Sequence, residues 1–300
     1  MALCPLCTAD DARRLYSLAE GYATVQCRRC RFVFMSPRPT PDYLNAYYQS
    51  APVYSYTSAK AEDYAAVVAD RAQMIHRFTE RLPAVARSGV AVDLGAGNGN
   101  TVKALEALGY EAIGVELSDE ARKAGEALFH VRLQDGDLRA FDAESLSLLT
   151  MFDVLEHMLD PVERLTEAYA RLKPGGGLII GVPNFDALDR IFTGARSKAL
   201  IFPEHVNQFR KGTLRAATER TGFVTRYIGS PPPYGVAITF GWRWALRKAF
   251  GDTGITRTLS RLLVWIKRHI VYPVPNFVVE KTGWLGQSLL IVAQKPETES

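Results

Sequence analysis

The residues with the clearest chemical signal are the four cysteines, which all lie in the first thirty positions of this 300-residue chain. They form two Cys-x-x-Cys pairs, with nineteen residues (8–26) between the pairs. Two such pairs are typical of a zinc ribbon, in which four thiolates bind one tetrahedral Zn²⁺ and leave no open position. We therefore expect a structural zinc ion with Cys4, Cys7, Cys27 and Cys30 as ligands. A module of about 35 residues has almost no core of its own, so the metal would supply most of its folding free energy.

A second signal is a glycine-rich loop between a predicted strand and a predicted helix. The apolar run 90–94 leads into Gly95, Gly97 and Gly99, and a helical pattern follows at 101–108. Alternate glycines let the backbone turn tightly and approach a ligand at a helix N-terminus. The spacing is G-x-G-x-G and not the G-x-G-x-x-G of dinucleotide sites, which favours an adenosyl ligand without a pyrophosphate.

Two acidic residues accompany this loop. Asp93 stands two positions before the first glycine, and Glu116 ends the next apolar strand at 112–116. An acid at the end of the second strand of an α/β sheet can accept hydrogen bonds from both hydroxyls of a ribose. The loop and the acids together predict a nucleoside-type site at the carboxyl ends of parallel strands.

Two of the five histidines lie where such a sheet would hold a ligand. His157 follows the fourth predicted strand, and His205 follows Glu204 beyond the fifth. Histidine has an ordinary pKa near neutral pH, so it can act as a general base. We expect His205 to be a catalytic base, Glu204 to orient it, and His157 to line the pocket. The alternative is that either histidine only braces a loop.

The order of predicted elements indicates how these residues are positioned. Strands alternate with helices in the central part of the chain, which predicts an α/β fold with a parallel sheet. Helical patterns also cover 42–48 and 61–85, and a polar and aromatic loop at 51–57 between them is suited to close over a ligand. The domains that we expect are a zinc ribbon at 1–40, a helical linker or lid at 41–88, a ligand-binding core at 89–234, a basic amphipathic insert at 235–285, and the last core strand with the tail at 286–300.

Composition and charge argue against a disordered, fibrous or membrane-spanning protein. The chain is 47% hydrophobic and 23% charged, which is typical of a folded globular protein. It has no run of about 18 apolar residues and no signal-peptide pattern, so we expect a cytoplasmic location. The net charge is only +4, and it does not by itself call for a nucleic-acid partner.

The basic excess is concentrated near the C-terminus. Residues 241–270 contain seven Lys or Arg and one acid, and the four tryptophans lie between 242 and 284. A basic, aromatic and amphipathic helix can lie in a bilayer interface, which predicts peripheral membrane contact through 241–270. The alternative is an ordinary lid, with its apolar side on the core and its charges in water.

Five motifs in chain order relate the sequence to a known family. They are V-D-L-G-A-G-N-G at 92–99, G-V-E at 114–116, G-D at 136–137, F-D-V-L-E-H at 152–157 and L-K-P-G-G-G at 172–177. Over roughly residues 70–230 and 286–295 the chain resembles the class I S-adenosylmethionine (SAM)-dependent methyltransferases. The resemblance implies a Rossmann-like, doubly wound sheet of seven mostly parallel strands with an antiparallel last strand, for which 288–293 is suited.

The same resemblance implies SAM as the cofactor and assigns a role to each motif. The glycine loop faces the methionine part, Glu116 holds the ribose, and Asp137 lies by the adenine amino group. The implied cofactor-binding set is Asp93, Gly95, Gly97, Gly99, Glu116, Asp137 and Phe152. The chain departs from the family at 145–150, S-L-S-L-L-T, where the family shows Phe-Asp. The start and register of the fourth strand therefore stay open.

A zinc ribbon followed by P-R-P-T and such a domain resembles methyltransferases of sugar, lipopolysaccharide and secondary-metabolite pathways. Segment 202–209 is similar to the Glu-His element of the sugar C-methyltransferases, in which the histidine abstracts a proton. We expect methyl transfer to an oxygen or carbon of a small molecule, with a lipid-linked sugar or glycolipid as a candidate acceptor and no nucleic-acid partner. The alternatives are an NAD-dependent oxidoreductase on a related fold and an RNA-directed methyltransferase that uses the ribbon for recognition.

Overall fold

The computed structural model of the chain describes residues 2–50, 61–197, 200–230 and 286–297. Three sequence predictions lie outside these residues: the loop at 51–57, the amphipathic insert at 235–285 and the membrane contact at 241–270. Among the described residues, no helix has the length and apolar character needed to cross a membrane.

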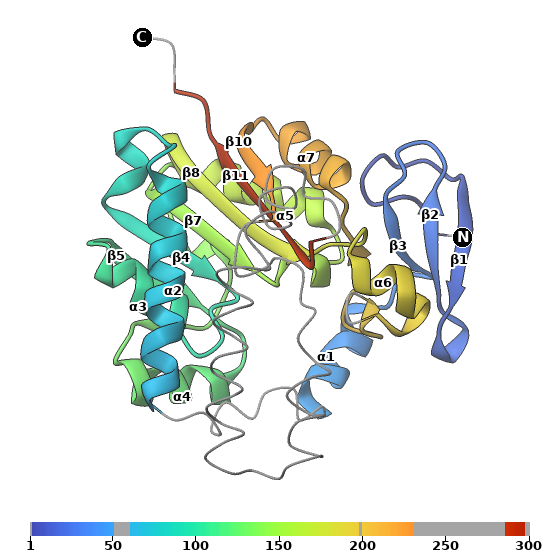
Figure 1. The fold of residues 1–300 in the computed structure, drawn as a ribbon, viewed down its shortest axis with the longest axis horizontal. Coiled ribbons are helices and arrows are strands. Elements are labelled where there is room, and N and C mark those ends of the chain that lie inside the picture. Colours follow the sequence, from blue (N-terminus) through green and yellow to red (C-terminus); the bar gives the residue numbers. More distant parts are fainter. Residues whose placement is uncertain (1, 51–60, 198–199, 231–285, 298–300) are drawn as a thin grey trace, which may run out of the picture.

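The larger of two sheets has seven strands in the order β10-β11-β8-β7-β4-β5-β6 (Figure 1). In chain order the strands are β4 (Val90–Leu94), β5 (Glu111–Val115), β6 (Leu133–Gln134), β7 (Leu146–Phe152), β8 (Leu172–Pro183), β10 (Val224–Gly229) and β11 (Ser288–Gln294). Strands β4 to β8 pair in parallel, whereas β11 is antiparallel to both β8 and β10. This arrangement confirms the predicted doubly wound, mostly parallel sheet with an antiparallel last strand.

The register of the fourth strand in chain order is now defined. Strand β7 pairs with β4 so that Leu148 lies opposite Ala91 and Thr150 lies opposite Asp93. All residues of β7 before Phe152 are buried. The polar residues Ser147 and Thr150 of this strand are buried along with its leucines, as expected for a central parallel strand that is covered on both faces.

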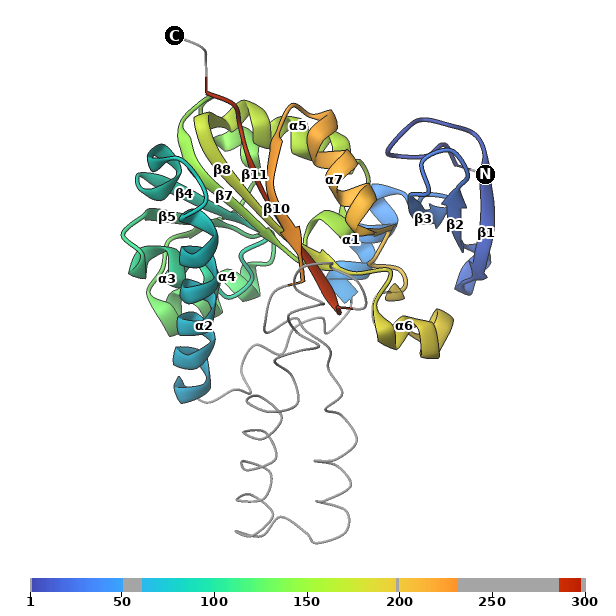
Figure 2. The same ribbon diagram turned by 45° about the horizontal axis from the view of Figure 1, so that its top comes forward.

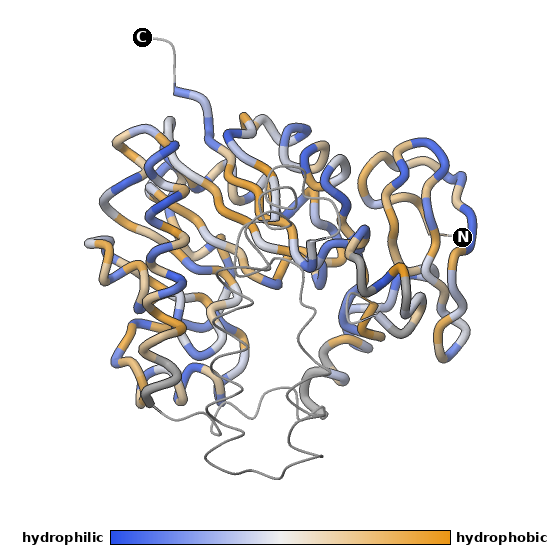
Figure 3. The backbone as a smooth tube through the Cα atoms, in the orientation of Figure 1, coloured by the Kyte–Doolittle hydropathy of each residue, from blue (hydrophilic) through white to orange (hydrophobic). Residues whose placement is uncertain are grey.

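Helices cover both faces of this sheet (Figure 2). They are α2 (Ala61–Thr79), α3 (Asn100–Ala107), α4 (Asp119–Phe129), α5 (Pro161–Arg171) and α7 (Lys211–Arg220), and two further helices, α1 (Pro41–Ser50) and α6 (Leu188–Thr193), lie beside the smaller sheet. Phe78 of α2 and Leu105 of α3 share one apolar cluster with Leu148, while Leu214 of α7 shares another with Leu149. Successive strand residues point to opposite faces, so neighbouring leucines serve different cores. Figure 3 shows the resulting apolar strands between more polar helices.

Helix α2 ends earlier than the periodicity at 61–85 predicted. It stops at Thr79, the amide of Leu82 donates to the Thr79 carbonyl, and Pro83 follows. Proline lacks an amide hydrogen and disfavours helical geometry in the residue before it. A 3₁₀ turn at Ala84–Arg87 then leads into β4.

The N-terminal module is joined to the core. Its strands β1 (Ala12–Ser17), β2 (Ala23–Cys27) and β3 (Val33–Ser36) form an antiparallel sheet whose fourth strand, β9 (Asn207–Gln208), comes from the core region. Cys27 and Phe32 belong to the same buried cluster as Leu214 of α7, and the rings of Phe32 and Phe209 lie 5.3 Å apart. The module, predicted to have almost no core of its own, thus shares the apolar core of the larger domain.

Candidate active site and metal centre

The glycine loop lies at the carboxyl end of β4. The Gly95 amide donates to the Val115 carbonyl at 2.8 Å, and the Gly97 amide donates to Glu116 Oε2 at 2.8 Å. The φ angles of Gly95, Gly97 and Gly99 are +71°, +54° and +81°, a region that residues with a side chain rarely adopt. Helix α3 starts directly after Gly99, so the free amides of its first turn face the loop. The loop is thus shaped to receive a ligand closely.

Glu116 is held in place by the backbone on both sides. Its Oε2 accepts from Gly97, and its Oε1 accepts from the Ser118 amide at 2.8 Å. A carboxylate offers about four acceptor sites, so it can still accept hydrogen bonds from a diol. The position is therefore suited to the ribose that the sequence predicted for it.

Asp93 is buried beneath the loop, with 2% of its surface exposed. Its Oδ1 accepts from Thr150 Oγ1 of β7 at 2.5 Å. Burial raises the pKa of Asp93 to about 7, although the hydroxyl of Thr150 and the charge of Arg71 act in the opposite direction. A nearby positive group, such as the ammonium or sulfonium of a bound ligand, would stabilise the ionised form of this carboxyl.

Arg71 of α2 is a residue that the sequence did not single out. Its guanidinium carbon lies 3.9 Å from the ring centroid of Phe152, the last residue of β7. Among the described residues, its buried Nη1 has no hydrogen-bond partner. A buried, unpaired guanidinium nitrogen is suited to a carboxylate ligand. No spacing distinguishes this arginine from the others in the chain, because its place beside Phe152 arises only from packing.

Asp137 follows β6 and begins a short 3₁₀ turn, Leu138–Ala140. Its Oδ1 accepts from the Arg139 amide at 2.8 Å, so the side chain has a capping role. The role beside an adenine amino group stays a prediction, as do the cofactor contacts of the other loop residues.

His157 and His205 lie together although 48 positions separate them in the sequence (205 minus 157). Their ring centroids are 4.9 Å apart, with the rings at 86° to each other. Burial and the neighbouring His205 lower the pKa of His157 to about 3. The structure thus brings both predicted histidines to one place beyond the carboxyl end of β7.

A carboxylate does lie beside the two rings, but it belongs to Glu156. One carboxylate oxygen of Glu156 and one ring nitrogen of each histidine lie within 4.8 Å of one another. Glu156 is 1% exposed, its oxygens have no hydrogen-bond partner in the part of the chain described, and burial raises its pKa well above the ordinary value. Glu204 instead accepts at Oε1 from the Tyr47 hydroxyl of α1 at 2.8 Å. Glu156 lies within the motif F-D-V-L-E-H, but only the fold shows that its side chain points toward the histidines.

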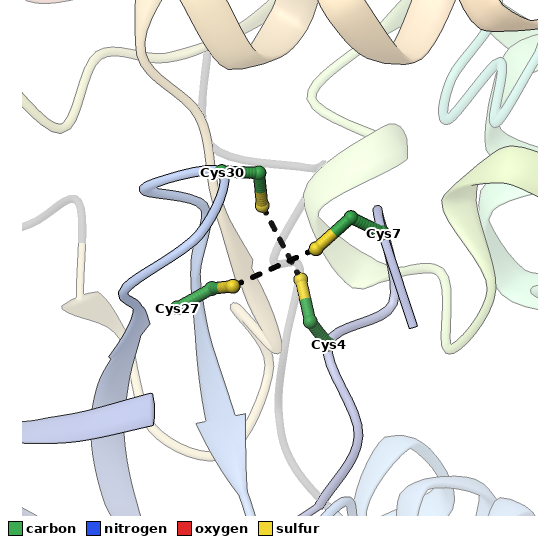
Figure 4. Close-up of side chains that lie close together, drawn as sticks. All are labelled: Cys4, Cys7, Cys27 and Cys30. Carbon is green, nitrogen blue, oxygen red and sulfur yellow. Dashed lines mark hydrogen bonds between the residues drawn. The ribbon is translucent and has the colours of Figure 1, made fainter. Parts of the chain in front are cut away.

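The four cysteines converge on one point between the two Cys-x-x-Cys turns (Figure 4). Cys4 Sγ lies 3.5 Å from Cys30 Sγ, and Cys7 Sγ lies 3.6 Å from Cys27 Sγ. Tetrahedral zinc with Zn–S bonds of about 2.3 Å needs sulfur atoms roughly 3.8 Å apart, so the four thiols fit this ion. Burial raises the pKa of Cys4 to about 11, and a cation would favour the thiolate form.

Comparison with known proteins shows the family to which the chain belongs. A family model described as a methyltransferase domain matches residues 67–227, more than half of the chain. The chain therefore belongs to this family of methyltransferase domains. In the solved structures, the PH0226 protein from Pyrococcus horikoshii OT3 has the same fold, with a TM-score of 0.51, 15% identity, and coverage of 83% of this chain and 98% of that one.

Two curated proteins are similar over shorter stretches. An uncharacterised protein in transposon Tn4556 of Streptomyces fradiae is 36% identical over 108 residues, which are 33% of this chain and 31% of that protein. Ubiquinone biosynthesis O-methyltransferase of Paraburkholderia phymatum is 24% identical over 151 residues, which are 46% of this chain and 65% of that protein. The chain thus spans less than two thirds of the length of either relative.

Proposed function

We propose that the chain transfers a methyl group from SAM to an oxygen or carbon of a small molecule. The observation that carries the proposal is the preformed contact of the Gly97 amide with Glu116, at the carboxyl end of the sheet of a methyltransferase domain. SAM supplies a methyl group that its positively charged sulfur has already activated. The residues of the chain then have to bind, align and exclude water.

The cofactor side is assigned to residues around the glycine loop. Glu116 accepts from the ribose hydroxyls, and Asp137 lies at the adenine end. Arg71 binds the carboxylate of the methionine part, because its Nη1 is buried and has no hydrogen-bond partner among the described residues. Asp93 compensates the positive charge of the ligand from below the loop.

The acceptor side is assigned to the histidine pair. His205 takes the proton from the acceptor hydroxyl or carbon, and the electron pair released forms the new bond to the methyl carbon while the carbon–sulfur bond breaks. His157, whose pKa is about 3, stays neutral at neutral pH and lines the pocket. Glu204 is assigned to orient His205, and the Tyr47 hydroxyl in turn donates to the Glu204 carboxylate.

We assign a lipid-linked sugar or glycolipid as the acceptor and favour oxygen as the methylated atom. The choice of oxygen is supported by the relative whose name describes O-methyl transfer in ubiquinone biosynthesis. The choice of a lipid-linked acceptor rests on the basic, tryptophan-rich insert in the sequence. The zinc ion is assigned a structural role, since four thiolates would saturate it.

The acceptor class can be tested with methyl-labelled SAM and an extract of the source cells. After incubation, the product is partitioned between organic solvent, water and precipitated macromolecules. Label in the organic phase would support a lipid-type acceptor, and label confined to water would replace it by a soluble metabolite. Label in RNA or protein would contradict the proposal of a small-molecule acceptor.

The base is tested by His205→Gln, with His130→Gln as the control because His130 is exposed at the end of α4. We expect His205→Gln to lower turnover by roughly 10²- to 10⁴-fold while SAM affinity is kept. Unchanged turnover would show that His205 only braces its loop.

A further inference from the structure

Arg38, which follows β3 of the N-terminal module, contacts both loops that carry the histidines. Its Nη1 donates to the Val206 carbonyl at 2.7 Å and to Asn207 Oδ1 at 3.0 Å. Its Nη2 donates to the Leu159 carbonyl at 2.5 Å and to the Met158 carbonyl at 3.4 Å. The acceptors are the residues that immediately follow His157 in one loop and His205 in the other.

The two loops are also tied to each other through Asn207. Its Nδ2 donates to the Met158 carbonyl at 2.5 Å, while Gln208 Nε2 donates to the His205 carbonyl at 3.0 Å. Arg38 therefore completes a network in which a single planar guanidinium lies between the loops. Burial lowers the pKa of Arg38 to about 10, because removal from water disfavours the charged guanidinium.

A sheet connects this network to the cysteines. Strand β9 pairs with β3, with Val33 opposite Gln208 and Phe34 opposite Asn207, and the Met35 amide donates to the Val206 carbonyl at 3.0 Å. Cys27 ends β2, and Cys30 lies in the turn between β2 and β3. The register of β3 against the His205 segment thus depends on the turn that the metal would hold.

We propose that the N-terminal module positions the two histidines, and that Arg38 is the positioning residue that transmits its effect. The catalytic meaning of this statement rests on the proposed function, but the positioning itself does not. Arginine is suited to the task because its planar group offers five fixed donors in diverging directions, whereas lysine offers one compact ammonium. A ribbon that only recognised a nucleic acid would have no need of such contacts.

The test compares Arg38→Ala and Arg38→Lys with Arg13→Ala. Arg13 is the matched control, since it lies on β1 and donates to Gln26 Oε1 within the same module. Four quantities are measured: bound zinc, SAM affinity by calorimetry, the pKa of His157 by NMR titration of the histidine rings, and methyl transfer from labelled SAM to the extract fraction that accepts label. Signals of the paired rings are assigned with His157→Gln and His205→Gln.

We expect both Arg38 variants to keep zinc and SAM affinity but to raise the pKa of His157 from about 3 toward 6.5, because separation of the loops exposes the ring and removes His205 from it. Turnover should fall by about 10²-fold, the typical effect of a misplacement near 1 Å, with little change in the KM for SAM. Arg13→Ala should change none of the four.

An unchanged pKa of His157 in Arg38→Ala would overturn the proposal. If Arg38→Ala does not fold, Arg38→Lys decides on the same readouts. The NMR result does not depend on the acceptor or on the reaction. A shifted pKa with unchanged turnover would therefore support the positioning and contradict the catalytic assignment of the histidines instead.

Discussion

Asp93→Asn is expected to remove a pH dependence of folding that the buried carboxyl creates. In the folded chain the pKa of Asp93 is about 7, mainly because of burial, against an ordinary value of 3.8. Between about pH 4 and pH 7 the folded state therefore holds a proton that the unfolded state has lost. The stability of the apo-protein decreases as pH rises through this window, by roughly 1.4 kcal/mol per unit, and levels off above it.

Two pH units of this window lie between about pH 5 and pH 8, so the carboxyl should account for a loss of about 3 kcal/mol. Urea unfolding of the SAM-free protein at these two values measures the loss. The wild type should lose about 3 kcal/mol more than Asp93→Asn does, while Asp142→Asn, a change at an exposed loop position, should follow the wild type. Equal losses in wild type and Asp93→Asn would refute the reasoning, because they would mean that Asp93 ionises as freely when folded as when unfolded.

Three further changes, one of them with a matched control, probe the predicted ribose-binding acid, the glycine loop and the predicted zinc ligands. Glu116→Gln should weaken SAM binding by roughly 10- to 100-fold, as expected for charge-assisted hydrogen bonds of about 1.5–3 kcal/mol, and calorimetry showing full affinity would contradict the ribose assignment. Gly99→Ala should lower the free energy of unfolding by about 1–3 kcal/mol, because φ is +81° and the new Cβ would lie 2.6 Å from Val131 Cγ2. Gly109→Ala is the control: φ is +88°, and the new Cβ would meet no atom of the described chain within 4 Å. Its loss of unfolding free energy should therefore come from backbone strain alone and be smaller in the same urea experiment. Cys27→Ser should reduce bound zinc to well below one ion per chain by atomic absorption, and full retention would exclude Cys27 as a ligand.

Short-range patterns account for the parts of the fold and site that could be predicted. The strand, the alternate glycines and the helix around Gly97 are adjacent in the chain, and the tight turn that they form requires those residue types at that spacing. The same holds for each Cys-x-x-Cys turn, because two cysteines three positions apart can present both sulfur atoms to one ion. The antiparallel last strand was implied by resemblance and is confirmed for β11.

Other predictions had less local support. The end of the helix predicted at 61–85 was wrong because apolar periodicity continues past Thr79, whereas the chain turns before Pro83. Glu204 was predicted to orient His205 from the similarity of segment 202–209 to a Glu-His element, and this role stays a prediction, with the Tyr47 hydroxyl as the partner of its carboxylate. The carboxylate beside the two rings is that of Glu156, and it comes from another loop.

The sequence by itself thus determined the class of fold, the glycine loop with Glu116, and the four cysteines that could bind a zinc ion. Only the tertiary structure decided which distant groups meet: Arg71 with Phe152, Arg38 with the loops of both histidines, and β9 with β3. The physical reason is that a turn or a ligand pair is specified by neighbours a few positions apart. A contact across more than a hundred residues, such as that of Arg38 with Val206, is specified by the packing of the whole chain.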